Sequence, residues 1–415
     1  MVSRRLWLWF ACVAFAFAWR ASAGEVIQPA DTLPETTPWD LIALSEAPAF
    51  RWAQEDGPVR SLYYTAEAYE GHDTEVFAYY ASPATISGET PADHAFPAVV
   101  LVHGGGGTAF PQWARLWAER GYAAIAMDLA GKLPSGERLP NGGPDQGDDT
   151  KFGKIDSALT DQWTYQAVAN VILAHSLIRN FPEVDADRTA VTGISWGGYL
   201  TCIVAGLDNR FKAAVPVYGC GYLEDGSAWL GQFAAMTEAQ RAKWTRYWDP
   251  SAYVGAAAMP VFFVNGTNDF AYWLEIYAKT YGLVRGERNL RITVIMPHGH
   301  EVGWAPEEIG LFVDQYLRGG PPLPKLALAE AQEGKVAANV QGSAIVVSGE
   351  LHYTIDHLPN PDRTWTTIPA TVSEGRLEAA APPDDATIWF FTATGDDGAI
   401  VSSELGFAKP EATLP

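Results

Sequence analysis

Between about residues 96 and 320, short apolar runs alternate with segments whose apolar positions repeat every three to four residues. A short continuous apolar run bounded by turn residues is typical of a strand that is buried on both faces. The runs are 98–102, 123–127, 189–192, 213–218, 261–264 and 290–296. This alternation predicts an α/β fold with a doubly wound, mostly parallel sheet.

The segments between the runs have helical faces. Phe110, Trp113, Ala114 and Trp117 follow the i, i+3, i+4, i+7 spacing, and Pro111 is suited to a first helical turn. The same spacing recurs within 167–178 and 309–316. Each of these segments is therefore predicted to be a helix that packs on the sheet.

Two stretches interrupt the alternation. Residues 131–155 are polar and rich in glycine, and residues 222–259 have helical patterns that include Trp229, Trp244 and Trp248. Both follow predicted strands, so both are expected above the carboxyl edge of the sheet, where ligands bind in such folds. We interpret 222–259 as a helical cap inserted into a catalytic domain that spans 24–320.

The flanks of this domain have a different pattern. Residues 24–58 form a polar lead-in, and 59–83 alternate as expected for a hairpin that turns near Gly71. After the proline-rich stretch 321–324, strand-like runs recur without helices, at 344–347, 351–354, 387–393 and 399–402. Residues 325–415 are therefore predicted to form a small Ig-like β-sandwich that folds independently and holds no catalytic group.

The first 23 residues are typical of a signal peptide. Arg4 and Arg5 precede an apolar run that is too short to span a bilayer, and Ala21-Ser22-Ala23 suits a signal peptidase. We therefore expect a secreted or periplasmic protein that begins at Gly24 and has no membrane anchor.

Charge and cysteine content limit the partners. Removing the signal peptide removes three arginines and no acidic residue, which takes the formal net charge from −21 to −24. Such a chain repels phosphate backbones, so nucleic acid is not expected as a partner. Cys202 and Cys220 would remain, and their spacing leaves both a disulfide and two free thiols open.

The candidate nucleophile is Ser195. Gly193-Ile194-Ser195-Trp196-Gly197 lies between a predicted strand and a predicted helix, and the motif G-x-S-x-G in that context forms a nucleophile elbow. A serine needs a base, and the base needs an orienting carboxylate. In such sites the acid and the histidine follow the serine along the chain, each after a later strand.

Asp269, in the loop after 261–264, is the candidate acid, with an N-cap as its alternative role. His298 and His300 follow the next strand, and either imidazole could be the base. We favour His300, because Gly299 could adopt positive φ and turn the chain back toward Ser195. His298 would then be structural or would contact substrate.

Backbone N–H groups are the candidates for an oxyanion hole. One is that of Trp196, directly after the serine, and a second comes from the loop His103-Gly104-Gly105-Gly106-Gly107, where we favour Gly105.

No metal site is expected, because His300-Glu301 begins an H-E-x-x-H pattern but Trp304 replaces the second histidine. No cofactor is expected.

Together, the HGGGG loop, the GISWGG elbow, NGTND and MPHGH resemble the α/β-hydrolase superfamily over about residues 60–320. Within it, the chain is similar to the dienelactone hydrolase-like, acetyl xylan esterase-like and prolyl oligopeptidase-like branch. Dienelactone hydrolases carry a cysteine where this chain has Ser195, and acetyl xylan esterases carry Gln where it has Trp196.

The resemblance implies a serine hydrolase that cleaves carboxylic esters through an acyl-enzyme. We expect a small-molecule or carbohydrate ester as substrate, with Trp273 and Trp304 as substrate-binding residues. An exported prolyl oligopeptidase-like aminopeptidase is the alternative enzyme, and a ligand-binding protein on an inactive scaffold is the alternative outside enzymes. The oligomeric state stays open.

Overall fold

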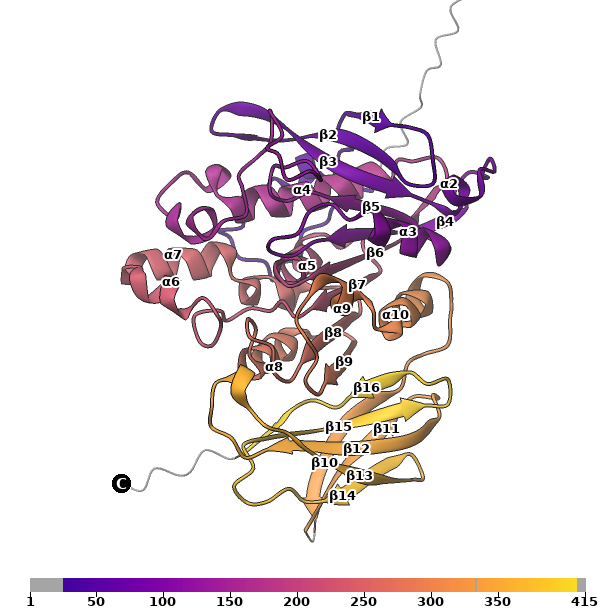
Figure 1. Ribbon diagram of the computed structural model, residues 1–415, viewed down its shortest axis with the longest axis vertical. Helices are drawn as coiled ribbons and strands as arrows, with labels where there is room; N and C mark the ends of the chain where they lie inside the picture. The colour runs from indigo at the N-terminus through magenta and orange to yellow at the C-terminus, as the bar shows by residue number, and fades with distance from the viewer. Residues whose placement is uncertain (1–24, 333, 409–415) are drawn as a thin grey trace, which may run out of the picture.

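The computed structural model describes residues 25–332 and 334–408 (Figure 1). The predicted signal peptide and its cleavage site lie outside the described residues.

A mixed sheet forms the centre of the larger domain, in the spatial order β2, β3, β5, β4, β6, β7, β8, β9. Strands β5, β4, β6, β7, β8 and β9 run parallel to one another. Strands β2 and β3 form the expected antiparallel hairpin, and β1 pairs with β2. The bounds are β1 (Phe50–Gln54), β2 (Arg60–Tyr69), β3 (His72–Ala81), β4 (Phe96–Val102), β5 (Ala123–Met127), β6 (Val184–Ile194), β7 (Ala213–Val217), β8 (Val261–Gly266) and β9 (Arg288–Thr293). The predicted α/β sheet is confirmed.

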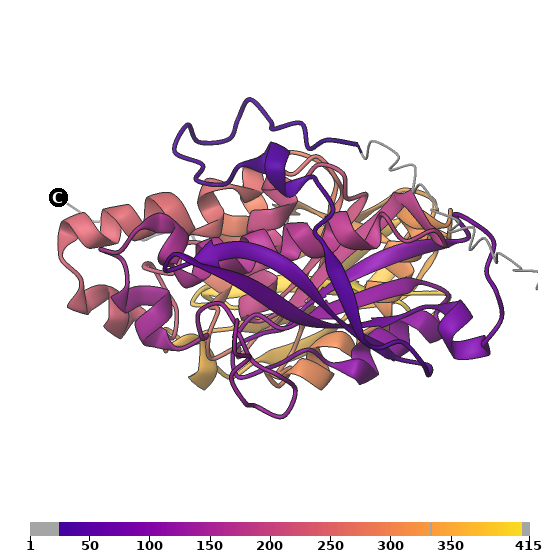
Figure 2. The ribbon, with the colours of Figure 1, turned by 90° about the horizontal axis from the view of Figure 1, so that it is seen from above.

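Helices cover both faces of this sheet (Figure 2). Strands β5 and β7 have no exposed position, which explains why their sequences are continuously apolar. The helices are α1 (Leu41–Leu44), α2 (Pro83–Ser87), α3 (Pro111–Glu119), α4 (Trp163–Ile178), α5 (Trp196–Leu207), α6 (Leu230–Ala235), α7 (Glu238–Trp248), α8 (Leu274–Leu283), α9 (His300–Trp304) and α10 (Glu307–Leu317). Short 3-10 turns span Leu159–Asp161, Pro250–Ala252, Val254–Ala256 and Asn360–Asp362, and Asp149–Gly153 forms one π-helical turn.

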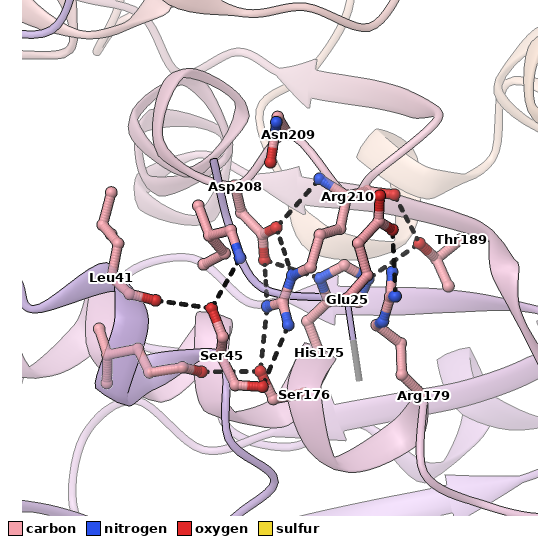
Figure 3. A network of polar contacts seen from close by, with 12 residues as sticks. Glu25, Leu41, Ser45, His175, Ser176, Arg179, Thr189, Asp208, Asn209 and Arg210 are labelled. Atoms are coloured by element: carbon pink, nitrogen blue, oxygen red, sulfur yellow. Dashed lines mark hydrogen bonds and ion pairs between the residues drawn. The ribbon is translucent and has the colours of Figure 1, made fainter. Parts of the chain in front are cut away.

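A buried polar network fastens the N-terminal lead-in to α4 and α5 (Figure 3). Asp208, which ends α5, accepts from Nδ1 of His175 at 2.8 Å and from Nη2 of Arg210 at 2.7 Å. Arg210 also donates to the carbonyl oxygen of Ser45 in the lead-in. This His–Asp pair lies at the opposite end of α5 from Ser195 and is paired with arginine, so it is a structural ion-pair network.

The cap is held by its tryptophans. The indole N–H of Trp244 donates to the carbonyl oxygen of Lys151 at 3.0 Å, and that of Trp248 donates to Oε1 of Gln162 at 2.7 Å. Both rings are buried. The two insertions predicted from the sequence therefore pack against each other, and these two aromatics belong to the core.

The C-terminal region is built of antiparallel strands, at the lower end of Figure 1. Their bounds are β10 (Lys325–Gln332), β11 (Lys335–Gln341), β12 (Val346–Thr354), β13 (Thr366–Ser373), β14 (Arg376–Ala380), β15 (Ile388–Gly395), β16 (Ile400–Ser402) and β17 (Gly406–Phe407). Strand β12 contains the predicted run 351–354 and the second half of the predicted run 344–347. Strand β16 pairs with β9, at Ser402 and Leu290, so the two regions share a hydrogen-bonded edge.

Candidate active site

Ser195 lies at a sharp turn between β6 and α5. Its backbone has φ 59° and ψ −118°, a strained conformation for a residue with a side chain. Its N–H donates to the carbonyl oxygen of Val217 at 2.9 Å. The serine is 7% exposed. The geometry is that of the predicted nucleophile elbow.

The glycines of the elbow are required by close backbone approach. A Cβ at Gly197 would lie 1.9 Å from the carbonyl oxygen of Val102, and one at Gly193 would lie 2.2 Å from the carbonyl oxygen of Gly197. The strand ends and the helix start therefore pack too tightly for any side chain at these positions.

Asp269 lies in the loop after β8, and its side chain is buried. Its Oδ1 accepts hydrogen bonds from the backbone N–H groups of Ala271 and Tyr272, at 2.9 and 2.8 Å. Its Oδ2 is 2.6 Å from Nδ1 of His298. One carboxylate oxygen thus fixes the acid, and the other orients an imidazole.

The imidazole that contacts Asp269 is that of His298. The sequence analysis favoured His300 for this position, so that prediction is wrong in this respect. The difference has a local cause: Gly299 has φ 178° and ψ 162°, so the chain stays extended and does not turn back after His298. The ring of His298 stacks on Tyr218, with centroids 4.3 Å apart, and the Tyr218 hydroxyl donates to the carbonyl oxygen of Pro297. These contacts hold His298 on the acid.

His300 has a different environment, at the start of α9. Its Nε2 accepts a hydrogen bond from the N–H of Gly104 at 3.0 Å, and its ring lies 4.8 Å from that of Phe110. Burial, with a smaller contribution from nearby His103, lowers the pKa of His300 to about 4. A neutral His300 therefore holds the glycine-rich loop.

The glycine-rich loop lies directly on the elbow. A Cβ at Gly104 would be 2.8 Å from Cβ of Ser195, and one at Gly105 would be 3.0 Å from Cδ1 of Trp196. His103 anchors the loop start, since its Nδ1 lies 2.7 Å from the carbonyl oxygen of Gly104 and its Nε2 accepts from the N–H of Leu129. Burial lowers the pKa of His103 to about 4.

Two backbone donors at the elbow have no acceptor among the described residues: the N–H of Trp196, which begins α5, and the N–H of Gly105. Orphan donors at a helix start stabilise negative charge. Their positions fit the predicted oxyanion hole, whose function stays a prediction.

Tyr272 lies next to the Asp269–His298 pair, and the sequence gave no reason to select it. Its side chain is buried, and its ring lies nearly parallel to that of His298, with centroids 6.5 Å apart. The hydroxyl has no hydrogen-bond partner among the described residues. Burial raises the pKa of Tyr272 well above 10, and the nearby Ser195 hydroxyl acts in the opposite direction.

Aromatic rings surround the elbow on the cap side. The ring of Trp196 lies 4.5 Å from that of Trp229, which in turn lies 5.3 Å from that of Tyr272. Nζ of Lys151 lies 4.2 Å above the Trp196 ring and 3.1 Å from Oδ1 of Asp148. A run of packed aromatic rings, from Trp196 through Trp229 to Tyr272, therefore lies at the elbow.

The two tryptophans predicted to bind substrate make packing contacts. The ring of Trp304 stacks on that of Trp113, 5.0 Å away, and Trp273 precedes α8 with its ring against Gly226. Their contact with substrate stays a prediction. Phe270 differs from these two tryptophans, because its side chain is 54% exposed and its ring lies 4.8 Å from that of His298.

Three further features concern the described residues only. Cys202 and Cys220 are both buried free thiols. In the part of the chain that the structure describes, no group of three or more His, Cys, Asp or Glu side chains could hold a metal ion. None of the described helices is both long and apolar enough to cross a membrane.

Comparison with known families gives one partial match. The model of the acetyl xylan esterase (AXE1) family matches residues 58–226, from β2 to beyond the elbow. Among curated proteins, an uncharacterized peptidase, YuxL, of Bacillus subtilis is 32% identical over 138 residues, which are 32% of this chain and 18% of that protein. A probable dipeptidyl-peptidase 5 of Emericella nidulans is 25% identical over 156 residues, covering 35% and 19%. The chain thus matches about a fifth of the length of each relative.

Comparison with solved structures supports the α/β-hydrolase fold that the sequence predicts. An acetyl xylan esterase from Paenibacillus sp. R4 superposes with a TM-score of 0.55 at 21% identity, covering 66% of this chain and 92% of that one. Acetyl xylan esterase 1 from Thermoanaerobacterium sp. gives 0.54 at 18% identity, covering 66% and 91%. The expected resemblance in fold is confirmed.

Proposed function

We propose that this chain, which has the α/β-hydrolase fold, is an exported serine esterase that removes short acyl groups from a carbohydrate. The observations that carry the proposal are the Asp269–His298 hydrogen bond and the strained Ser195 elbow. Tyr272 connects the two, since its N–H donates to Oδ1 of Asp269 and its side chain lies near Ser195. A buried carboxylate that orients an imidazole next to a serine is the arrangement that activates a hydroxyl nucleophile. The triad of the proposal is Ser195, His298 and Asp269.

The mechanism follows from the hydrogen bonds. Because Oδ2 of Asp269 holds Nδ1–H of His298, Nε2 is the nitrogen left to take the Ser195 proton as Oγ attacks the ester carbonyl. The N–H groups of Trp196 and Gly105 would bind the oxyanion. His298 then protonates the leaving alcohol, water attacks the acyl-enzyme, and the proton returns to Ser195.

The enclosure of the elbow supports a short acyl group. Trp196, Trp229 and Tyr272 are all buried, and they form a rigid wall on the cap side of the serine. Enlarging such a space means displacing an aromatic side chain, which is costly in a packed interior. An acetyl group is the acyl group that this wall suits best.

The exposed Phe270 supports a sugar as the alcohol part. It lies against His298, the residue that hands a proton to the leaving group, so its ring faces the side from which the alcohol departs. An exposed aromatic ring offers an apolar face to a sugar ring. We therefore assign the alcohol side to Phe270.

A peptidase is the second candidate, because both curated relatives described above are named as peptidases. The same triad would serve an amide, so the substrate decides between the two. An inactive scaffold is a weaker alternative, since the residues that the proposed mechanism uses and both backbone donors are all present.

A substrate panel tests the proposal on the purified chain. Acetyl esters of p-nitrophenol and acetylated xylan should be turned over, longer acyl esters should be slower, and aminoacyl anilides should be slowest. Equal or faster turnover of anilides would assign the chain to the peptidases. No turnover, together with no labelling by a fluorophosphonate, would favour the inactive scaffold.

A further inference from the structure

A segment of the C-terminal region contacts the loop that carries the acid. Asn360, at the start of the 3-10 turn Asn360–Asp362, is wholly buried. Its Nδ2 donates to the backbone carbonyl oxygen of Asp269 at 2.9 Å, and its Oδ1 accepts from the N–H of Leu274 at 3.3 Å. One amide side chain thus holds the acid residue and the start of α8.

A second contact joins the same two segments from the other direction. Nδ2 of Asn268 donates to the carbonyl oxygens of Pro361 and Arg363, at 3.1 and 2.6 Å. Asn268 and Asp269 are neighbours in the chain, so both residues of the acid loop are tied to the region 360–363.

The region 360–363 is itself braced. Nη1 of Arg363 donates to Oδ1 of Asn360 at 3.2 Å, its Nε donates to the carbonyl oxygen of Leu358, and its Nη2 pairs with Glu275 of α8. Arg363 is buried, and charge-assisted hydrogen bonds of this kind are stronger than neutral ones. Arg363 therefore holds Asn360 in position for its contacts with Asp269 and Leu274.

We propose that Asn360 is a positioning residue for the acid of the triad, so that the C-terminal region completes the active site of the catalytic domain. The inference rests on the proposed function. It gives the C-terminal strands a role that the prediction of an independent sandwich did not include.

The physical reason is the accuracy that a triad needs. The side chain of Asp269 is held by its own loop, at Ala271 and Tyr272, but the backbone carbonyl of the same residue is held by Asn360. Without that donor, a buried carbonyl oxygen would lose its partner, and the loop would move to satisfy it. A shift of about 1 Å in the Asp269–His298 pair costs on the order of 100-fold in rate.

The test compares Asn360→Ala with His352→Ala. His352 is also a buried polar residue of the C-terminal region, but its two ring nitrogens contact Thr367 and Thr392 within that region. We expect Asn360→Ala to lower kcat about 10- to 100-fold with little change in KM, and His352→Ala to lose thermal stability while keeping kcat. Equal kcat losses in the two variants at matched loss of Tm would overturn the proposal.

A double-mutant cycle separates positioning from general damage. In an Asp269→Asn background the acid no longer stabilises the imidazolium, so Asn360→Ala should cost little more. Undiminished loss in that background would contradict the role. Asn268→Ala, which removes the second contact at a partly exposed residue, should show a smaller loss of the same kind if Asn360→Ala does not fold.

A spectroscopic readout keeps this inference separate from the proposed function. The short Asp269–His298 hydrogen bond should give a far-downfield Nδ1 proton resonance, which should broaden or shift in Asn360→Ala and stay in place in His352→Ala. A wild type that neither hydrolyses p-nitrophenyl acetate nor reacts with a fluorophosphonate would end the proposed function, while this resonance would still test Asn360. An unchanged resonance in Asn360→Ala would end the inference alone.

Discussion

The N–H of Gly104 donates to Nε2 of His300 at 3.0 Å, and this bond connects the glycine-rich loop to the helix that follows the other histidine. The imidazole that faces the acid and the imidazole that supports the loop are thus two residues apart. His298 contacts the acid and His300 supports the glycine-rich loop, although the sequence segment His298-Gly299-His300 does not show which histidine has which role.

This division predicts unequal mutants. His298→Ala should lower kcat about as much as Ser195→Ala, by roughly 10⁴- to 10⁶-fold, because triad members act as a unit. His300→Ala should lose much less, about 10- to 100-fold, through displacement of the loop. His300→Gln, which can still accept from Gly104, should recover most of that loss. Steady-state kinetics on p-nitrophenyl acetate decide it, and an inactive His300→Gln beside an active His298→Ala would reverse the assignment.

For Tyr272→Phe we predict that kcat falls while Tm does not. Its buried hydroxyl lacks a partner and lies near Ser195, so Tyr272→Phe removes no hydrogen bond that the described fold uses. We expect Tm to stay the same or rise, and kcat to fall by about tenfold as a donor near the reacting oxygen is lost.

Tyr277→Phe is the matched control for Tyr272→Phe. Its hydroxyl is also buried and unpartnered among the described residues, but it lies on α8 against the ring of Phe263. It should show the same effect on Tm and no loss of kcat. Equal losses of kcat in both variants would mean that the hydroxyl of Tyr272 has no special place in the site.

The buried neutral histidines predict sensitivity to acid. Burial lowers the pKa of His103 and of His352 to about 4, whereas an unfolded histidine titrates near about 6.5. The unfolded chain therefore binds more protons between these values, and the free energy of unfolding falls as the pH drops from about 6.5 to 4. Each such histidine contributes a slope of up to about 1.4 kcal/mol per pH unit.

Denaturant titrations from about pH 7 to about pH 4.5 measure that slope. His352→Gln should make the dependence on pH shallower, because it removes one titrating group far from the elbow. A slope that is unchanged in this variant would show that His352 titrates alike in the folded and the unfolded chain, which would contradict the prediction.

Strands β4, β5, β7 and β8 were predictable because they are buried along almost their whole length and so carry an unbroken apolar signal. The positions of Ser195 and Asp269 followed from their places after strands. The C-terminal strands gave weaker signals, since β13 alternates between exposed and partly buried positions and has no continuous apolar run. Five of those strands, β10, β11, β13, β14 and β17, were not predicted.

The choice between His298 and His300 depended on one dihedral angle that the sequence does not encode. Gly299 can adopt positive φ, but here it is extended, and that single difference exchanges the tasks of the two rings. The bond between Asn360 and Asp269 spans 91 positions in the chain and leaves no local pattern. Contacts of this kind are set by tertiary packing, so only the structure shows them.

The formation of an acetyl-enzyme on Ser195 tests the central claim most directly. Wild-type protein and the Ser195→Ala variant would be quenched soon after mixing with p-nitrophenyl acetate, digested and mapped by mass spectrometry. The account predicts an acetyl group on the peptide that contains Ser195, much slower to form in His298→Ala and absent from Ser195→Ala. An acetyl group on another residue, or undiminished hydrolysis by Ser195→Ala, would contradict it.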